Sequence, residues 1–349
     1  LPSRGLGDVY KRQAQDLRIE ERPVDAPVAG QVAIEMQAGG ICGSDLHYYQ
    51  HGGFGPIRLR EPMVLGHEVA GIIRELGAGV TGLEIGQLVA ISPSRPCNSC
   101  EYCLLGQQNH CLNMRFYGSA MPFPHIQGAF QQQLIADAEQ CVPADGLTAG
   151  EAAMAEPLAV SLHAVRQVGD LVGKTVLVTG CGPIGILTIM AARRAGAGTV
   201  IATDLSDFTL QKAAQAGADA VYNMAKEPDA LSRFGAAKGS IDVQFECSGA
   251  ASALSGGVAV LRPGATLVQL GLGGDMQVPM QSLTAKEIIL RGSFRFHPEF
   301  AIAVGMMQKG LIDVKPLITH SLPLDAALTA FELASDREVA IKAQINFQG

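Results

Sequence analysis

The sequence predicts an α/β protein with two domains, one rich in β-strands and one built around a doubly wound parallel sheet. From about Gln15 to Glu156, short apolar runs are separated by Gly and Pro, which is typical of antiparallel strands joined by loops. From about Pro157 to Phe296, strand-like and helix-like segments alternate, which is typical of a parallel sheet covered by helices on both faces. The length of 349 residues suits two hydrophobic cores better than one.

The β-rich block supplies the first domain, which we expect to cover residues 14–156. Its clearest strands are expected at the apolar runs 32–36, 69–76 and 88–91. Residues 297–349 return to mixed character and end in a strand-like run over 340–347, so we expect them to rejoin this domain. Residues 1–13 share no pattern with the rest of the chain, and we expect them to be an extraneous remnant of cloning or sequence assembly.

The second domain is expected to cover residues 157–296. Strands are predicted at 174–179, 199–203, 243–246, 266–270 and 288–293. Helices are predicted at 186–195 and 210–216, and Gly217 closes the second of them. Strands that alternate with helices in this way predict parallel pairing throughout the sheet.

Composition excludes several classes of function. The net charge is −7 and no cluster of Lys and Arg is present, so we expect no nucleic-acid partner. No apolar run reaches the roughly 18 residues that a membrane-spanning helix needs, so we expect no membrane association. The composition is that of a compact enzyme, for which a cytoplasmic location is the expectation.

A glycine-rich turn, Gly180-Cys181-Gly182-Pro183-Ile184-Gly185, follows a predicted strand and opens a predicted helix. This G-x-G-x-x-G pattern binds the pyrophosphate of a dinucleotide when it lies between a strand and a helix. Gly180 permits the tight turn, Gly182 lets a pyrophosphate approach the backbone, and Gly185 allows close packing of helix on strand. The helix N-terminus, with Pro183 and Ile184, offers free N–H groups to the anion. We therefore predict a nicotinamide dinucleotide site.

Asp204 ends the next predicted strand, at the spacing where a carboxylate accepts a hydrogen bond from the ribose 2′-hydroxyl. A carboxylate in this position repels a 2′-phosphate, and the residues that follow, 205–208, include no Arg to receive one. These features favour NAD over NADP.

Four cysteines, Cys97, Cys100, Cys103 and Cys111, lie within one short loop. Four thiolates surround one Zn²⁺ tetrahedrally and leave no open position, which is the arrangement of a structural zinc site. Four cysteines also hold iron–sulfur clusters, and zinc is favoured over that alternative. A disulfide framework is not expected, because such scaffolds are short and dense in cysteine.

Three further motifs contain metal-binding side chains: Gly40-Ile41-Cys42-Gly43-Ser44-Asp45, Gly66-His67-Glu68 and Glu156-Pro157-Leu158. A lone Cys or His is more often inert, but together with the four-cysteine loop and the glycine turn these motifs resemble the zinc-containing medium-chain alcohol and polyol dehydrogenases. The resemblance covers nearly the whole chain from about residue 15. It implies a GroES-like catalytic domain interrupted by a Rossmann domain.

The resemblance also implies site residues. Cys42 and His67 correspond to ligands of a catalytic zinc, and Glu68 and Glu156 to acids that exchange or share its remaining coordination. About two zinc ions per chain are therefore expected, one catalytic and one structural. Glu156 stands where alcohol dehydrogenases carry a second Cys, which indicates the polyol branch. Ser44 is the expected first member of a proton relay, with His47 and Tyr48 nearby in the sequence.

Two segments, 116–125 and 291–296, resemble a member of that branch that oxidises a sugar acid, and imply oxidation of L-idonate to 5-ketogluconate. The candidate substrate residues are Tyr48, Arg115, Phe116, His125, Arg295 and Phe296. Among them Arg295 matches a substrate carboxylate by its planar guanidinium fork, although a structural ion pair or a contact to hydroxyls is an alternative role.

Other interpretations stay open. A sorbitol-, xylitol- or threonine-type dehydrogenase is possible on the same scaffold. A zinc-less nucleotide-binding protein without turnover is disfavoured by Cys42 and the four-cysteine loop. The branch implies a homotetramer or a homodimer.

Overall fold

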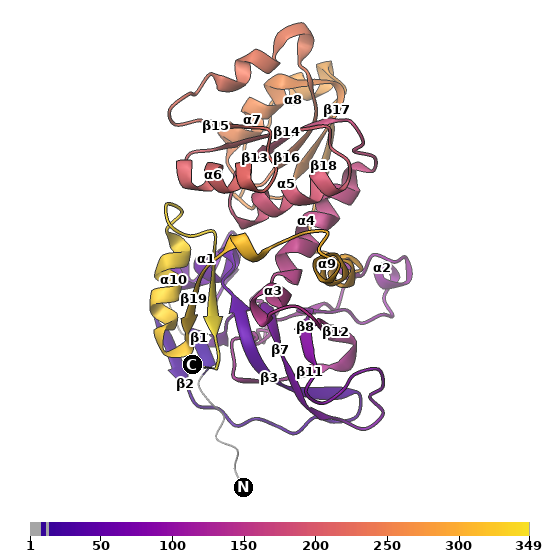
Figure 1. Cartoon of the computed structure of the whole chain (residues 1–349), viewed down its shortest axis with the longest axis vertical. Helices are drawn as coiled ribbons and strands as arrows, with labels where there is room; N and C mark the ends of the chain where they lie inside the picture. Colours follow the sequence, from indigo (N-terminus) through magenta and orange to yellow (C-terminus); the bar gives the residue numbers. More distant parts are fainter. Residues whose placement is uncertain (1–7, 12–13, 349) are drawn as a thin grey trace. The chain divides into compact units, whose positions relative to one another are not determined.

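The computed structural model describes residues 8–11 and 14–348, and these form two compact units (Figure 1). Unit 1 contains the described residues up to Glu156, the segment Phe300–Asp336 and the residues from Lys342 onward. Unit 2 contains Pro157–Glu299 and the short segment Arg337–Ile341. The predicted α/β class with a β-rich part and a parallel sheet is confirmed.

Unit 2 is built on six parallel strands in the order β15-β14-β13-β16-β17-β18. Their bounds are β13 (Thr175–Thr179), β14 (Thr199–Asp204), β15 (Ala220–Asn223), β16 (Ile241–Glu246), β17 (Leu261–Gln269) and β18 (Ile289–Gly292). The strand order reverses between β13 and β16. Ligands of open α/β sheets bind at the carboxyl ends of the strands at such a reversal.

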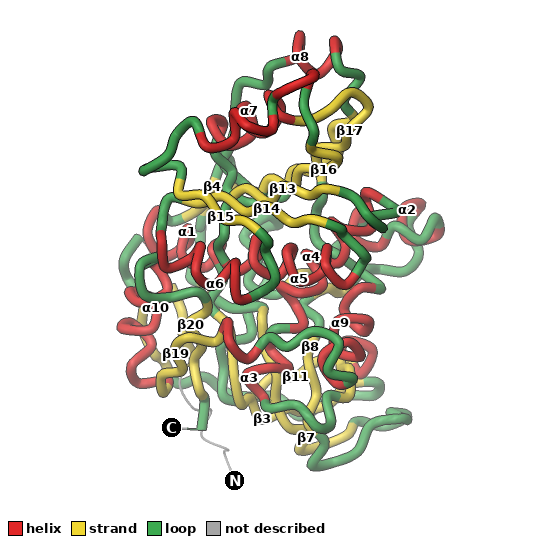
Figure 2. The backbone as a smooth tube through the Cα atoms, turned by 45° about the horizontal axis from the view of Figure 1, so that its top comes forward, coloured by secondary structure: helices red, strands yellow, loops and turns green. Residues whose placement is uncertain are grey.

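Helices cover both faces of this sheet (Figure 2). On one side lie α5 (Pro183–Arg194) and α6 (Asp207–Gln215), and on the other lie α7 (Ala251–Val260) and α8 (Met280–Ala285). Helix α5 begins three residues before the predicted start, because Pro183 is well suited to the first helical position and lies inside the glycine turn.

Unit 1 contains a seven-stranded sheet in which β3 (Gln31–Gly40) is central. Its other strands are β7 (Glu68–Leu76), β8 (Leu88–Ile91), β11 (Gln133–Asp137), β12 (Cys141–Pro143), β19 (Ile318–Pro323) and β20 (Lys342–Asn346). Strand β3 is long enough to pair with β7 and also with both β11 and β20. All pairs are antiparallel except β19 with β20.

Smaller sheets complete unit 1. Strand β1 (Asp8–Lys11) lies between β2 (Leu17–Glu20) and β6 (Met63–Val64), β4 (Gly53–Phe54) pairs with β5 (Ile57–Arg58), and β9 (Ser94–Arg95) pairs with β10 (Arg115–Phe116). The sequence expectation set all of residues 1–13 outside the fold. Strand β1 corrects it for residues 8–11, whereas residues 1–7 and 12–13 lie outside the described part of the chain.

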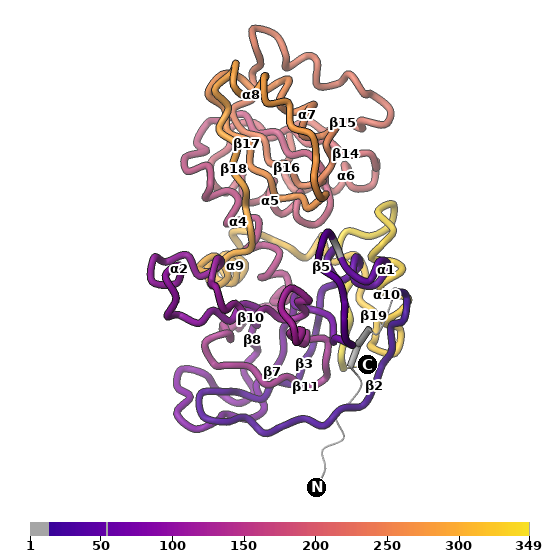
Figure 3. The backbone as a smooth tube through the Cα atoms, turned by 180° about the vertical axis from the view of Figure 1, so that it is seen from behind, coloured from indigo at the N-terminus to yellow at the C-terminus, as the bar shows by residue number. Residues whose placement is uncertain are grey.

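The remaining helices are α1 (Gly43–His51), α2 (Glu101–Leu104), α3 (Ala149–Ala153), α4 (Ala155–Val168), α9 (Glu299–Gln308) and α10 (Ala327–Ser335). Short 3₁₀ turns occur at 108–110, 138–140, 230–234, 236–238, 315–317 and 324–326. Figure 3 shows that the loop carrying α2 runs out from the strands of its own unit. Among the described residues no helix is both long and apolar enough to cross a membrane.

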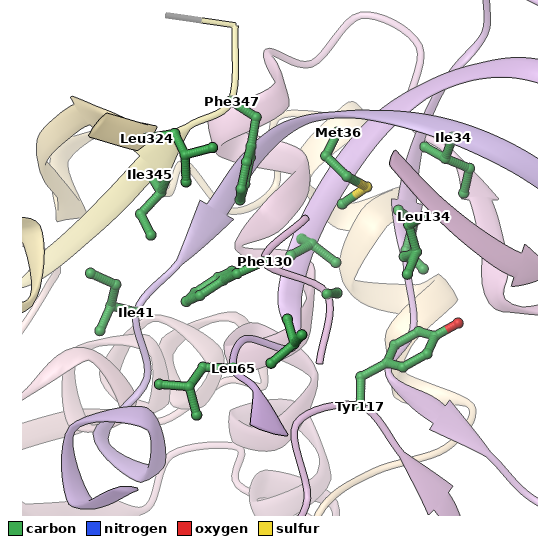
Figure 4. Packing of buried hydrophobic residues seen from close by; sticks show 14 of the residues in the cluster. Ile34, Met36, Ile41, Leu65, Tyr117, Phe130, Leu134, Leu324, Ile345 and Phe347 are labelled. Carbon is green, nitrogen blue, oxygen red and sulfur yellow. The ribbon is translucent and has the colours of Figure 1, made fainter. Parts of the chain in front are cut away.

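Phe130 lies in the middle of the unit 1 core (Figure 4). Its side chain is fully buried, and its ring centroid lies 6.2 Å from that of Phe347 and 6.4 Å from that of Phe331. A Cβ on Gly66 would lie 2.1 Å from the Phe130 ring, and Gly66 has a φ of +91°. Gly66 therefore has no tolerated replacement, and the packing of Phe130 on it fixes the backbone that leads into His67.

We expect Phe130→Ala to lower the free energy of unfolding of unit 1 by about 3–5 kcal/mol, because it empties a filled core site. Phe123→Ala is the matched control, since that ring is 56% exposed. Urea unfolding followed by far-UV circular dichroism measures both. Equal stability losses in the two variants would contradict the assignment of Phe130 to the core.

Candidate functional site

Cys42, His67 and Glu68 form a cluster of possible metal ligands in unit 1. One ligand atom of each lies within 4.8 Å of the others, and His67 and Glu68 are buried. Cys42 immediately precedes α1, while Glu68 is the first residue of β7. Because Gly40 pairs with Glu68 across β3 and β7, the strand register brings the two motifs together. The predicted residues thus meet in space although they are far apart in the sequence.

The carboxylate of Asp45 fixes the two loops that carry Cys42 and His67. It is fully buried, and it accepts hydrogen bonds from the backbone N–H of Cys42 at 3.0 Å and of Gly66 at 3.0 Å. Nδ1 of His67 lies 3.8 Å from an Asp45 oxygen and has no hydrogen-bond partner. A buried imidazole that faces a carboxylate and keeps hydrogen-bonding capacity is typical of a metal-binding histidine.

Glu68 is held by Lys342, a residue that the sequence analysis did not identify. The ammonium nitrogen of Lys342 lies 2.8 and 2.6 Å from the two Glu68 oxygens and 3.1 Å from the Ile41 carbonyl oxygen. A Cβ on Gly40 would lie 2.2 Å from a Glu68 oxygen, so a glycine is required there. The sequence did contain a signal for this role, because Lys342 lies inside the predicted C-terminal strand. A charged side chain that is buried in a sheet requires a partner of opposite charge.

Glu156 lies near this cluster from the first turn of α4, although it is not within the 4.8 Å group. Burial raises the pKa of its carboxyl to about 8, His67 opposes this rise, and the charges of Glu68 and Cys42 add to it. Burial and Glu68 likewise raise the pKa of the Cys42 thiol to about 12. Burial is the larger cause of both shifts, and the neighbouring anionic groups add to it.

The charge balance of the cluster indicates a cation. The buried acids Asp45, Glu68 and Glu156 outnumber the one buried ammonium group, Lys342, among the described residues of the cluster. A divalent ion would compensate the excess charge and stabilise the thiolate and the carboxylate. Cys, His and carboxylate ligands together fit Zn²⁺ with a position open to water or substrate.

The four cysteines of the α2 loop form a second cluster, in which all four sulfur atoms lie within 4.8 Å of one another. The sulfurs of Cys97 and Cys111 are 3.5 Å apart, as are those of Cys100 and Cys103. These distances exclude disulfides, whose S–S bond is about 2.05 Å. Hydrogen bonds from Ser99 lower the pKa of Cys97 to about 5, which favours the thiolate that binds zinc. The set fits a closed tetrahedral site.

The predicted proton-relay residues lie on α1. Ser44 is half-buried in its first turn, and His47 is exposed one turn later. Tyr48 is 2% exposed, and its hydroxyl accepts a hydrogen bond from the Ala120 N–H at 3.0 Å. Ser44 and His47 are three residues apart and therefore lie on the same face of α1.

The predicted substrate residues of unit 1 have different environments. Phe116 is buried, with its ring centroid 5.6 Å from that of His67, whereas Arg115 is exposed. His125 is 5% exposed, and both its ring nitrogens are engaged. Nε2 accepts from the Arg60 N–H at 2.9 Å, and Nδ1 lies 2.9 Å from the Pro122 carbonyl oxygen. His125 thereby holds its loop in place.

The other two predicted substrate residues belong to unit 2, after β18. Arg295 is half-buried, has a φ of +56°, and places its guanidinium 4.8 Å from the centroid of the Phe294 ring. Phe296 is fully buried. The left-handed backbone at a non-glycine residue marks a constrained position, which is common at functional sites.

The glycine turn lies between β13 and α5, as the motif requires. A Cβ on Gly185 would lie 1.8 Å from the Gly180 carbonyl oxygen, and one on Gly180 would lie 2.8 Å from Ser248. A Cβ on Gly182, in contrast, would meet nothing within 4 Å. The outer glycines are thus required by packing, and the middle one leaves open space at the N-terminus of α5, where an anion binds well.

A cavity of about 520 Å³ opens at the carboxyl ends of the unit 2 strands. Its lining includes Gly180, Asp204, Ser206, Ser248 and Arg337. The size is within the usual range of about 300–1,000 Å³ for ligand sites. It lies where the strand order reverses, which is the expected position for a dinucleotide.

Asp204 reaches the glycine turn through its side chain. One carboxylate oxygen accepts from the Cys181 N–H at 2.6 Å, and the other accepts from the N–H groups of Leu205 and Ser206 at 2.7 and 3.1 Å. At the end of β16, which pairs with β13, the buried carboxylate of Glu246 accepts a hydrogen bond from the Ser248 N–H at 2.8 Å and fixes the loop that follows β16.

Two family descriptions match the chain. Residues 28–146 match the alcohol dehydrogenase GroES-like domain, and residues 183–309 match the zinc-binding dehydrogenase domain. The two clusters of possible metal ligands lie within the first match, and most residues that line the unit 2 cavity lie within the second.

Individual proteins match over almost the full length. The chain is 42% identical to L-idonate 5-dehydrogenase (NAD(P)(+)) of Escherichia coli K12, over 90% of this chain and 91% of that protein. It is 37% identical to human sorbitol dehydrogenase, over 91% of this chain and 89% of that protein. The crystal structure of the E. coli L-idonate 5-dehydrogenase superposes with a TM-score of 0.94, covering 98% of both chains at 40% identity.

We expect zinc binding at the Cys42 cluster to release a proton from Glu156. The affinity of this cluster for zinc should therefore rise between about pH 6 and pH 8. Below a pKa of about 8 the carboxyl of the zinc-free protein is protonated, so protons compete with the cation. Calorimetric titration of zinc-depleted protein in two buffers of different ionisation enthalpy measures the protons released. Glu156→Gln should release about one proton fewer than the wild type or the exposed-acid control Glu139→Gln. Equal release in all three would contradict the prediction.

Proposed function

The chain belongs to the zinc-binding alcohol dehydrogenase family, and we propose that it oxidises a secondary alcohol of a sugar acid, L-idonate, to the ketone 5-ketogluconate. The observation that supports this chemistry is the cluster of half-buried Cys42 with buried His67 and Glu68, which has an excess of acidic groups. The substrate rests on the similarity to the E. coli protein named L-idonate 5-dehydrogenase.

Two zinc ions per chain are part of the proposal. The catalytic ion is assigned to Cys42 and His67 with Glu68 or Glu156, and the structural ion to Cys97, Cys100, Cys103 and Cys111. The first set leaves a coordination position open, and the second does not. This difference supports the division of roles.

A secondary alcohol in water has a pKa far above neutrality, so its hydroxyl proton must be removed as hydride leaves. A zinc ion held by Cys42 and His67 with Glu68 or Glu156 would supply Lewis-acid stabilisation of the alcohol oxygen. In this proposal Ser44 takes that proton and the exposed His47 passes it to solvent. Phe116 beside His67 excludes water from the reacting centre. NAD supplies the hydride acceptor.

NAD is proposed as the preferred cofactor over NADP. Its pyrophosphate would lie over Gly182 at the N-terminus of α5, contacting the turn Gly180–Gly185. Asp204 is at the end of β14, the position where a carboxylate favours a ribose hydroxyl.

Substrate selection is proposed to involve Arg295, whose guanidinium fork matches a carboxylate. Phe116, Tyr48, His125 and Arg115 of unit 1 and Phe296 of unit 2 are further candidates for substrate contacts. The similarity to human sorbitol dehydrogenase favours neutral polyols as the second candidate substrate class.

A homodimer or homotetramer in the cytoplasm completes the proposal. Edge strand β18 leaves Ile289 and Leu290 48% and 43% exposed, which supports pairing with a second copy. None of the eight cysteines forms a disulfide, which supports a reducing compartment.

We expect Cys100→Ser to lose about one of two zinc ions and to melt at a lower temperature, because the α2 loop loses its only closed ligand set. Metal analysis and thermal unfolding measure both effects. The folded fraction should keep more activity than Cys42→Ser, which removes a catalytic ligand. Retention of both ions at an unchanged melting temperature would show that the four cysteines do not hold a structural zinc.

Arg295→Ala should lower kcat/KM for L-idonate by about tenfold or more, since a charged hydrogen bond contributes roughly 1.5–3 kcal/mol. Sorbitol has no carboxylate and should be affected less. Arg291→Ala is the matched control, because Arg291 is an exposed arginine of the same segment as Arg295. Its guanidinium donates a hydrogen bond to the Gln167 carbonyl oxygen. An equal loss for both substrates would exclude Arg295 as the carboxylate receptor.

A further inference from the structure

We propose that Arg337 forms a subsite for the 2′-phosphate of NADP, so that this chain accepts both nicotinamide dinucleotides. The inference rests on the proposed function, in which the unit 2 cavity binds the adenosine half of the cofactor. It adds a residue that the sequence analysis did not consider and that lies far from the glycine turn along the chain.

Arg337 reaches the cavity because the segment Arg337–Ile341 belongs to unit 2, while α10 before it and β20 after it belong to unit 1. The Ser206 hydroxyl donates a hydrogen bond to the Arg337 carbonyl oxygen at 3.4 Å. Ser206 is also the N-terminal cap of α6 and lies two residues after Asp204, the last residue of β14. The contact therefore fixes Arg337 beside the residues that follow Asp204.

The same cavity wall contains Asp204, Leu205, Ser206 and Arg337. A ribose that is bound at the end of β14 has its 2′ position at this wall. Arg337 is exposed there, so its guanidinium is accessible to an incoming ligand. An exposed guanidinium at the rim of a ligand cavity is well suited to a phosphate, which it contacts through two parallel N–H groups.

Asp204 opposes a 2′-phosphate less than its charge alone suggests. Its oxygens accept three backbone N–H groups, those of Cys181, Leu205 and Ser206, and these dipoles partly compensate the negative charge. The carboxylate therefore serves to join the glycine turn to the β14–α6 turn. That role does not depend on which dinucleotide is bound.

Glu338 also lines the cavity and adds a negative charge beside Arg337. Together with Asp204 it keeps the wall from becoming strongly cationic. The combination accounts for a site that prefers NAD and still accepts NADP, with Arg337 as the residue that supplies the affinity for the extra phosphate.

The test uses the zinc-loaded full chain and two probes, 5′-AMP and 2′,5′-ADP, which differ by the 2′-phosphate. Calorimetry gives both dissociation constants for the wild type, Arg337→Ala, Arg337→Lys and the control Arg194→Ala. Arg194 is an exposed arginine of unit 2 outside the cavity lining. Steady-state kinetics then gives the ratio of kcat/KM for NADP to that for NAD.

We expect Arg337→Ala to weaken 2′,5′-ADP at least about tenfold more than 5′-AMP, and to lower the NADP-to-NAD ratio by a similar factor. Arg337→Lys should retain part of the wild-type affinity for 2′,5′-ADP, and Arg194→Ala should retain all of it. Equal weakening of both probes, or no weakening, would overturn the subsite. If the wild type bound neither probe, the nucleotide assignment of the cavity would fail instead.

Discussion

The buried ion pair between Lys342 and Glu68 is the contact on which the metal-ligand cluster most depends. It joins three strands, because Glu68 begins β7, Lys342 begins β20, and Gly40 at the end of β3 leaves space for the carboxylate between them. Both side chains are almost completely buried, so either one without the other would be an uncompensated charge in the interior. The C-terminal strand is therefore part of the site and does not merely close the sheet.

The same pair governs the electrostatics of the cluster. Burial alone would lower the pKa of Lys342, but the carboxylate of Glu68 raises it, so the ammonium group stays charged. One cation is still too few for Asp45, Glu68, Glu156 and the Cys42 thiol. Burial is the main cause that raises the pKa of the Glu156 carboxyl to about 8, and the charges of Glu68 and Cys42 add to the rise. A cluster that must either keep protons or bind a cation is suited to reversible coordination of a metal and its substrate.

Features with a local signature could be predicted from the sequence. The strand over 88–91 has the predicted bounds, and the glycine turn lies between its strand and helix, because spacing and residue type determine these features locally. The partners of Lys342 and Arg337 could not be predicted, since they are distant in sequence and become neighbours only through strand register and chain path. Tyr48 and His125 show the converse. Their residue types suggested substrate contacts, whereas their polar atoms are engaged by backbone groups of the fold.

We propose that the Cys42–His67 cluster binds the zinc ion on which alcohol oxidation depends. The most direct measurement is the rate of NADH formation from L-idonate by protein that has been depleted of zinc and then titrated with the metal. We expect activity to be lost on depletion and to return in proportion to the zinc bound at this cluster, with its maximum at about one ion per chain there. A depleted protein that oxidised L-idonate at the full rate would contradict it.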